Sequence, residues 1–157
     1  MHPESVNTLR IPTINYGEKV EIFHPLLRIG RGGSFVDNVG SGGIECSINL
    51  ETGVILCAGD DMGNNYTYHP DTNIKLVGFQ IPKWNEAVET AINLAKQVPD
   101  VRYVGWDLAL TADGWVMIEG NEDGQFPFQH FPRVGLANEV KQIYRKLNDN
   151  NYDKSKN

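Results

Sequence analysis

The order of patterns along the sequence predicts an α+β fold, a largely antiparallel sheet with helices packed on one face. The first half contains short β-rich stretches, an amphipathic helix follows Pro82, and a hairpin then precedes a second helix. The chain has 157 residues, 40% of them hydrophobic, which suits one domain with a substantial core. We expect this domain over residues 1–148 and a polar, frayed tail over 149–157.

Five stretches of the first half are rich in β-forming residues and bounded by turn residues. They are residues 8–14, 20–23, 26–30, 44–48 and 54–58. Apolar and polar residues alternate in the fourth stretch, which predicts a half-buried strand. The segment 30–43 contains six glycines, which is typical of a flexible loop.

Two later stretches place apolar residues at steps of three and four, as amphipathic helices do. The first helix is expected between Pro82 and Pro99, since proline disrupts a helix interior. The second is expected over about residues 136–147. Between them, residues 103–110 and 115–121 are expected to pair as a hairpin.

The composition argues against several classes of protein. A net charge of -6 with scattered basic residues argues against a nucleic-acid binder. The apolar runs are far shorter than the roughly 20 residues of a membrane-spanning helix. The start of the chain lacks the apolar segment of a signal peptide, so we expect a cytoplasmic protein. Cys46 and Cys57 are expected to be free, buried thiols, with a disulfide between them as the alternative.

The hairpin brings three polar side chains to one face. If residues 112–114 form a three-residue loop that ends in a glycine, Asp107 lies directly opposite Glu119. The two-residue period of a strand then puts Asn121 on the same face. The other face is expected to contribute core side chains. These are Val104, Trp106, Leu108, Leu110, Val116 and Ile118.

Two carboxylates placed opposite each other in a strand pair lie about 5 Å apart, and their repulsion disfavours the pairing. A divalent cation would reverse the sign of that interaction. Two carboxylates and an amide form an all-oxygen ligand set that suits Mg²⁺, which completes its octahedron with water and phosphates. The alternative is that Asp107 and Glu119 are ordinary solvated charges on the wet face of the hairpin.

These residues resemble the ATP-grasp superfamily, which has an acidic residue on one strand and a Glu-x-Asn motif on the next. Here Asp107 is followed twelve residues later by Glu119-Gly120-Asn121. A longer ordered series of motifs resembles the branch called sugar-transfer-associated ATP-grasp proteins. The series is HPESVNTLRI, LRIGRGGSFVDNVGSGG, ETG, YHPDT, IPKWNE and GWDLALTADGWVMIEGN. It runs from residue 2 to 121, about three quarters of the chain.

The resemblance implies the role of each matching residue. The expected ligands of one or two Mg²⁺ ions that bridge the phosphates of ATP are Asp107, Glu119 and Asn121. Two arginines are expected to contact the phosphates as catalytic and ATP-binding residues, and the glycine-rich segment is expected to lie beside them. The arginines are Arg10 and Arg28, and the segment contributes Asn38, Gly42 and Gly43. Such assignments agree with the planar, bidentate contacts that arginine makes with phosphate.

Simpler interpretations remain for several of these residues. Arg10 could extend to solvent, as long basic side chains often do. Arg31 competes with Arg28 for the second basic position. The glycine-rich segment could be a surface loop without a ligand. We expect His69, which precedes a proline, to hold a turn and not to act as a base, because no nucleophile is indicated beside it.

The resemblance implies an ATP- and Mg²⁺-dependent carboxylate–amine ligase that works through an acyl phosphate, linked to polysaccharide or cell-surface sugar biosynthesis. Its partners would be a small carboxylate and an amine. The family's nucleotide-covering half is expected to precede residue 1, so we expect this portion to be inactive alone and to self-associate or dock with that half. Two alternatives are a non-catalytic binding module derived from such an enzyme, and a structural domain whose acidic hairpin binds nothing.

Overall fold

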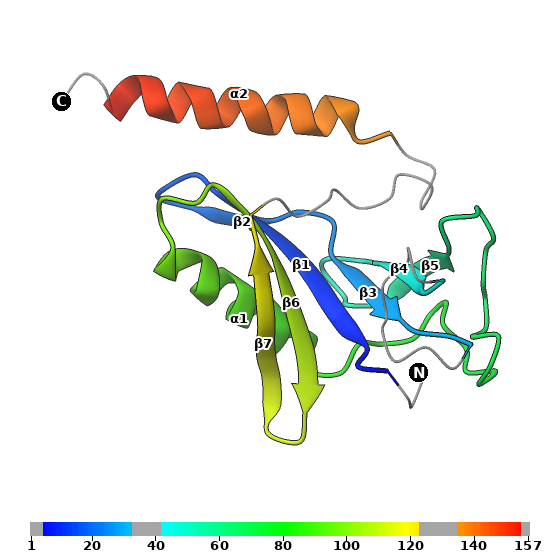
Figure 1. Cartoon of the computed structure of the whole chain (residues 1–157). Coiled ribbons are helices and arrows are strands. Elements are labelled where there is room, and N and C mark those ends of the chain that lie inside the picture. Colours follow the sequence, from blue (N-terminus) through cyan, green and yellow to red (C-terminus); the bar gives the residue numbers. More distant parts are fainter. Residues whose placement is uncertain (1–4, 33–41, 123–134, 155–157) are drawn as a thin grey trace.

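The computed structural model describes residues 5–32, 42–122 and 135–154, with side chains through residue 148 (Figure 1). The described part contains seven strands and two helices. The strands are β1 (Thr8–Asn15), β2 (Val20–Ile22), β3 (Leu26–Ile29), β4 (Ile44–Ile48), β5 (Ile55–Gly59), β6 (Tyr103–Thr111) and β7 (Gly114–Asn121). The helices are α1 (Trp84–Gln97) and α2 (Ala137–Lys154), and α2 extends beyond the end expected near residue 147.

The strands form one antiparallel sheet in the order β5-β4-β3-β1-β6-β7, and β2 also pairs with β1. β1 is central because it pairs with β6 along seven residues, from Thr8 to Ile14. Its other edge pairs first with β3 and then with β2. Pro12, which has no N–H to donate, lies where the neighbour changes. The expected α+β class and largely antiparallel sheet are confirmed.

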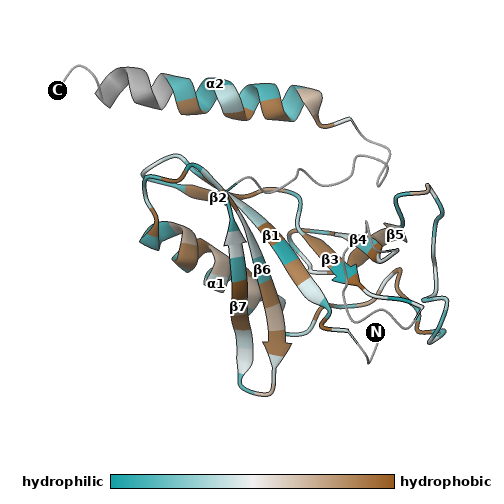
Figure 2. Ribbon diagram, in the orientation of Figure 1, coloured by the Kyte–Doolittle hydropathy of each residue, from teal (hydrophilic) through white to brown (hydrophobic). Residues whose placement is uncertain are grey.

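The main core lies between one face of the sheet and α1. The helix buries Trp84, Ala87, Ala91 and Ala95, which recur at steps of three and four. They belong to a buried cluster with Leu9 and Ile11 of β1, and with Trp106 and Leu108 of β6. Brown segments recur along α1 in Figure 2, as this one-sided burial requires.

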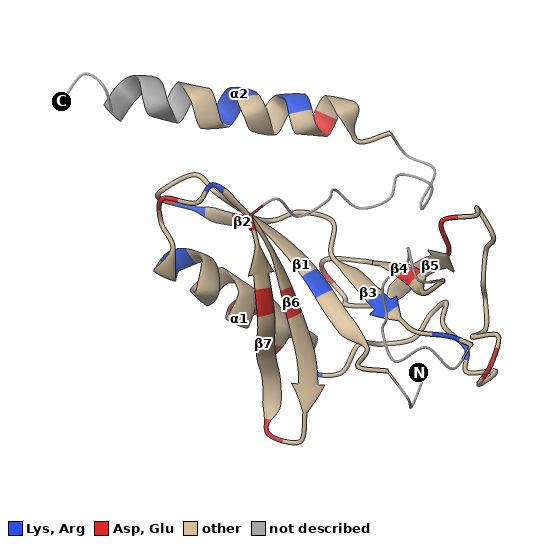
Figure 3. Ribbon diagram, viewed as in Figure 1, with Lys and Arg blue, Asp and Glu red and all other residues tan. Residues whose placement is uncertain are grey.

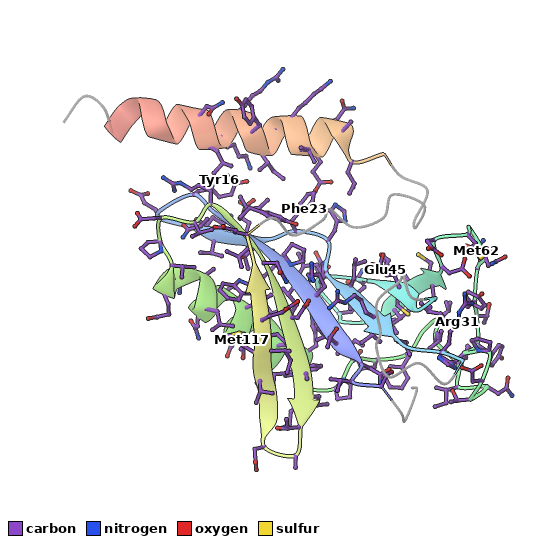
Figure 4. All side chains as sticks on the ribbon, in the orientation of Figure 1. Tyr16, Phe23, Arg31, Glu45, Met62 and Met117 are labelled. Atoms are coloured by element: carbon purple, nitrogen blue, oxygen red, sulfur yellow. The ribbon has the colours of Figure 1, made fainter. Side chains whose placement is uncertain are left out.

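The second helix packs against the other face of the sheet, so the expectation that both helices lie on one face was wrong. Side chains alternate along β1, and Leu9 and Ile11 point toward α1, whereas Ile14 has the orientation of Arg10. Ile14 belongs to a second cluster, in which α2 side chains pack on Tyr16 and Phe23. Figure 4 shows these two aromatic side chains between the ribbon of the sheet and α2.

The turn of the β6–β7 hairpin is one residue shorter than expected. Thr111 pairs with Gly114, whose φ of +130° is unusual for residues with a side chain, so the loop has two residues instead of three. A β-bulge then compensates, because Leu108 pairs with Met117 while Asp107 pairs with Glu119. The expected pairing of Asp107 with Glu119 is therefore confirmed, although the expected turn was wrong.

Only half of the side chains expected in the core face of the hairpin are buried. Val104, Trp106 and Leu108 are buried, but the apolar side chains at the end of β6 and along β7 are exposed. Their exposed fractions are 40% for Leu110, 42% for Val116 and 55% for Ile118. β7 lies at the end of the sheet order, and Figure 2 shows the brown middle of this edge strand. An edge strand has only one neighbouring strand, so more of its side-chain surface is exposed to solvent.

Cys46 and Cys57 are both free, as expected, but only Cys46 is buried, whereas Cys57 is partly exposed. Burial raises the pKa of the Cys46 thiol well above its ordinary value, so this group stays neutral at physiological pH. Among the described helices, none has the length and apolar character that a membrane crossing needs.

Candidate functional site

Charged side chains from four strands meet on the sheet face opposite α1. Figure 3 shows basic segments on β1 and β3 beside acidic segments on β6 and β7. The strand register explains the meeting: Arg10 faces Asp107, and Asp107 faces Glu119. Arg28 faces Thr8, which lies two residues before Arg10 and therefore on the same face.

Arg10 and Asp107 form a two-bond ion pair. The Nε of Arg10 donates to Oδ1 of Asp107, and its Nη2 donates to Oδ2 at 2.8 Å. Gly105 makes room for this arginine, because a Cβ added at Gly105 would lie 3.0 Å from Cδ of Arg10. Arg10 is thus held along the sheet and does not extend to solvent.

Arg28 reaches the same carboxylate from the other side of β1. Its Nη2 donates to Oδ2 of Asp107 at 2.7 Å. Its Nε and Nη2 also donate to the hydroxyl oxygen of Thr8, at 3.2 Å and 3.1 Å. Thr8 is a site residue that the sequence analysis missed. Its two-residue spacing from Arg10 was the available signal, but the contact with Arg28 depends on the pairing of β1 with β3.

The electrostatic environment keeps this cluster ionised. The Asp107 side chain is only 2% exposed, and those of Arg10 and Arg28 are 12% and 14% exposed. Burial alone would raise the pKa of Asp107, but the hydrogen bond from Arg10 and the charge of Arg28 outweigh it and lower that pKa. Burial would likewise lower the pKa of Arg10, yet its bonds and charge interaction with Asp107 raise it.

The end of β7 adds oxygen donors beside this pair. Glu119 is exposed and lies directly opposite Asp107 in the β6–β7 register. The amide nitrogen of Asn121 donates to Oε1 of Glu119 at 2.9 Å. Gly120 lets β7 approach the indole of Trp106, since an added Cβ would lie 2.6 Å from its Cζ3 atom. The predicted trio of Asp107, Glu119 and Asn121 is therefore brought to one place.

This trio fits a magnesium ion. Asp107 already accepts one N–H at Oδ1 and two at Oδ2, and a carboxylate offers about four such positions. One position on Oδ1 therefore remains, and the register places Asp107 opposite Glu119, whose Oε1 accepts the amide N–H of Asn121. Among the described residues, no group of three or more His, Cys, Asp or Glu side chains is placed to hold a metal ion. Mg²⁺ commonly uses one or two carboxylates and takes its other ligands from water and phosphates.

Arg31 belongs to a separate network, which resolves its competition with Arg28. Its Nη2 contacts Oδ2 of buried Asp60 at 3.0 Å, its Nη1 donates to the hydroxyl of Tyr66, and its Nε donates to the carbonyl of Gly42. Arg31 therefore fixes the base of the glycine-rich segment, while Arg28 enters the Asp107 cluster. Gly43 is buried immediately before β4. Asn38 lies outside the described residues, so its expected contact with ATP stays a prediction.

His69 has a structural position, as expected. It is 1% exposed, and its Nε2 lies 2.9 Å from the carbonyl oxygen of Gly30. Its Nδ1 accepts the backbone N–H groups of Asp71 and Thr72 at 3.3 Å and 3.4 Å. Because Nδ1 accepts, the proton belongs on Nε2, and the imidazole joins the turn to the end of β3.

Glu45 is a second residue on this face that sequence analysis did not single out. It pairs with Arg28 in the β3–β4 register, and it is only 8% exposed. Figure 4 labels it at β4, on the side of the sheet next to β3. The alternation of strand 44–48 had suggested a half-exposed carboxylate. The register therefore places the Glu45 carboxyl group beside the arginine end of the site.

The family model described as sugar-transfer associated ATP-grasp matches residues 1–145. The match includes every strand of the sheet and all the charged residues of the cluster. No protein in the curated set matches the chain.

Proposed function

The chain belongs to the sugar-transfer associated ATP-grasp family, and on that premise we propose that it is the metal- and phosphate-binding portion of an ATP-dependent carboxylate–amine ligase. Family membership indicates an ATP-grasp type of ligase or transferase. One observation supports the finer assignment. Two mostly buried arginines contact Asp107, which pairs with Glu119 across the hairpin, so anion donors and cation ligands adjoin on a single sheet face.

This arrangement suits the transfer of a phosphoryl group. Arg10 and Arg28 donate charge-assisted hydrogen bonds to the oxygens of the terminal phosphate, where negative charge develops during transfer. A magnesium ion held by Glu119, Asn121 and the open position of Asp107 would neutralise further charge on the phosphates. No side-chain nucleophile is required, and the raised pKa of Arg10 keeps that donor charged throughout.

The reaction then has two steps. An oxygen of the carboxylate substrate attacks the terminal phosphorus of ATP, the bond to the bridging oxygen breaks, and ADP leaves. The amine nitrogen next attacks the carbon of the acyl phosphate, inorganic phosphate leaves, and the nitrogen loses a proton to water. The chain's contribution is to bind, orient and stabilise the charged phosphoryl group in both steps.

The proposed function includes the class of substrate, the location of the reaction and the exclusion of water from the site. The substrates are a small carboxylate and a small amine in the biosynthesis of polysaccharide or cell-surface sugar, in the cytoplasm. Turnover needs a second, nucleotide-covering half. Glu119 and the apolar side chains of β7 are exposed in the described structure, whereas acyl transfer requires that water be excluded.

Thermal melting with Mg²⁺ and ATP tests the proposed site. At about a hundredfold excess over the dissociation constant, we expect wild type to melt about 5–10 °C higher. Glu119→Gln removes one charged ligand from an exposed position, so it should lose most of this shift with little change in the melting of the free protein. The matched control is Asp113→Asn, which changes an exposed carboxylate at the hairpin turn and should keep the shift.

An equal shift for wild type and Glu119→Gln would reject the hairpin as the metal site. No shift in wild type would favour the alternative, a non-catalytic binding module that keeps the fold of the family.

A further inference from the structure

Arg10 and Arg28 come from different strands, yet their Nη2 atoms donate to the same oxygen of Asp107, at 2.8 Å and 2.7 Å. Two guanidinium groups that share one acceptor atom are neighbours, and their like charges repel. Asp107 offsets this repulsion from the centre of the pair. It therefore does more than supply a metal ligand: it sets the spacing of the two arginines.

Thr8 fixes the second arginine from another direction. Its hydroxyl oxygen accepts both Nε–H and Nη2–H of Arg28, at 3.2 Å and 3.1 Å. Thr8 is only 6% exposed, and its branched side chain has few rotamers in a strand. With Thr8 on one side and Asp107 on the other, the plane of the Arg28 guanidinium has one orientation.

Gly105 has the corresponding effect on Arg10. The Arg10 side chain runs across the backbone of Gly105, where an added Cβ would come within 3.0 Å of Cδ and 3.3 Å of Nη1. A larger residue at this position would displace the guanidinium from Asp107. Within the described residues, the Nη1 atoms of Arg10 and Arg28 donate to no protein acceptor, so they can donate to an added anion.

We propose that Thr8 is a positioning residue that, with Gly105 and Asp107, holds Arg10 and Arg28 as one preorganised pair, and that this pair binds a phosphoryl anion without a metal ion. The proposal deepens the proposed function and rests on it for the identity of the anion. Because the pair is held by protein contacts alone, binding at the arginines does not depend on metal binding at Glu119 and Asn121. Preorganised donors lose little side-chain freedom when the anion arrives.

The test is calorimetric titration of the full chain with pyrophosphate in the presence of EDTA. Thr8→Val keeps the branched shape and removes the hydroxyl acceptor, so we expect pyrophosphate affinity to fall about tenfold or more. Thr8→Ser keeps the oxygen and should bind within about threefold of wild type. The control Asp113→Asn, an exposed change at the hairpin turn, should bind pyrophosphate as tightly as wild type under these conditions.

Gly105→Ala tests the other arginine, and it is the decisive variant if Thr8→Val does not fold. It should weaken metal-free binding to a similar extent. Equal affinities for wild type, Thr8→Val and Gly105→Ala would overturn the proposal. Binding of pyrophosphate only when Mg²⁺ is present would also overturn it while leaving the proposed function standing. A melting shift with Mg²⁺ and ATP that is equal in wild type and Glu119→Gln would instead reject the hairpin as the metal site, and it would leave metal-free binding by the arginine pair standing.

Discussion

Asp107→Asn should lower the free energy of unfolding by about 3–5 kcal/mol at neutral pH, the usual cost of removing one partner from a buried ion pair. The variant leaves two mostly buried guanidinium groups beside each other without a countercharge. It also changes one of the proposed metal ligands, so the melting shift with Mg²⁺ and ATP should fall as well. Urea unfolding monitored by tryptophan fluorescence measures the stability change.

The control for this experiment is Asp113→Asn, which changes an exposed aspartate at the turn of the same hairpin. A surface change of this kind should alter stability by less than about 0.5 kcal/mol. If Asp107→Asn were as mild as the control, the arginine pair would not depend on this carboxylate. The description of Asp107 as the centre of the site would then be wrong.

Asp60→Asn is expected to have a comparable effect, about 3–5 kcal/mol, at a position away from the Asp107 cluster. Asp60 is 1% exposed and pairs with Arg31. Its Oδ1 accepts the backbone N–H groups of Met62 and Asn64, and its Oδ2 accepts the hydroxyl of Tyr66 at 2.8 Å. Removing the charge weakens the turn and releases the arginine that holds Gly42.

The same residue gives a pH dependence. Burial would raise the pKa of Asp60, but its hydrogen bonds from Asn64 and Tyr66 and the charge of Arg31 lower it well below the ordinary value. A carboxylate with a lowered pKa in the folded state stabilises the protein above its unfolded pKa of about 3.9, and this contribution is lost as the pH falls further. Wild type should therefore lose stability steeply below about pH 4, and Asp60→Asn should lose less over the same range. Parallel curves would show that Asp60 does not contribute.

The sequence predicted the acidic half of the site because that half depends on local structure. A hairpin places Asp107 opposite Glu119 by counting from its turn, and the two-residue period adds Asn121. The count succeeded through two compensating differences. The turn is one residue shorter than expected, and the bulge at Ile118 restores the pairing. A bulge leaves no clear mark in a single sequence, so its position could not be predicted.

The basic half of the site depends on contacts between distant parts of the chain. Arg10 contacts Asp107, 97 residues away in the sequence, because β1 pairs with β6. The sequence of neither strand indicates which strand it pairs with. The choice between Arg28 and Arg31 also required the sheet register, as did the role of Thr8. The position of α2 on the second face was missed for a related reason: an amphipathic pattern shows that a helix packs, but not against which face.

The most direct test of the proposed site is a paramagnetic one, in which Mn²⁺ replaces Mg²⁺ in a titration with ATP. Amide resonances of the isotope-labelled chain are recorded as Mn²⁺ is added, since the ion broadens the signals of nearby nuclei. We expect the signals of Glu119, Gly120 and Asn121 to broaden at the lowest additions, together with that of Asp107 across the strand pair. Glu119→Gln should abolish this selectivity. Broadening centred on another acidic segment, such as Asp60–Asp61, or spread evenly over the chain would contradict it.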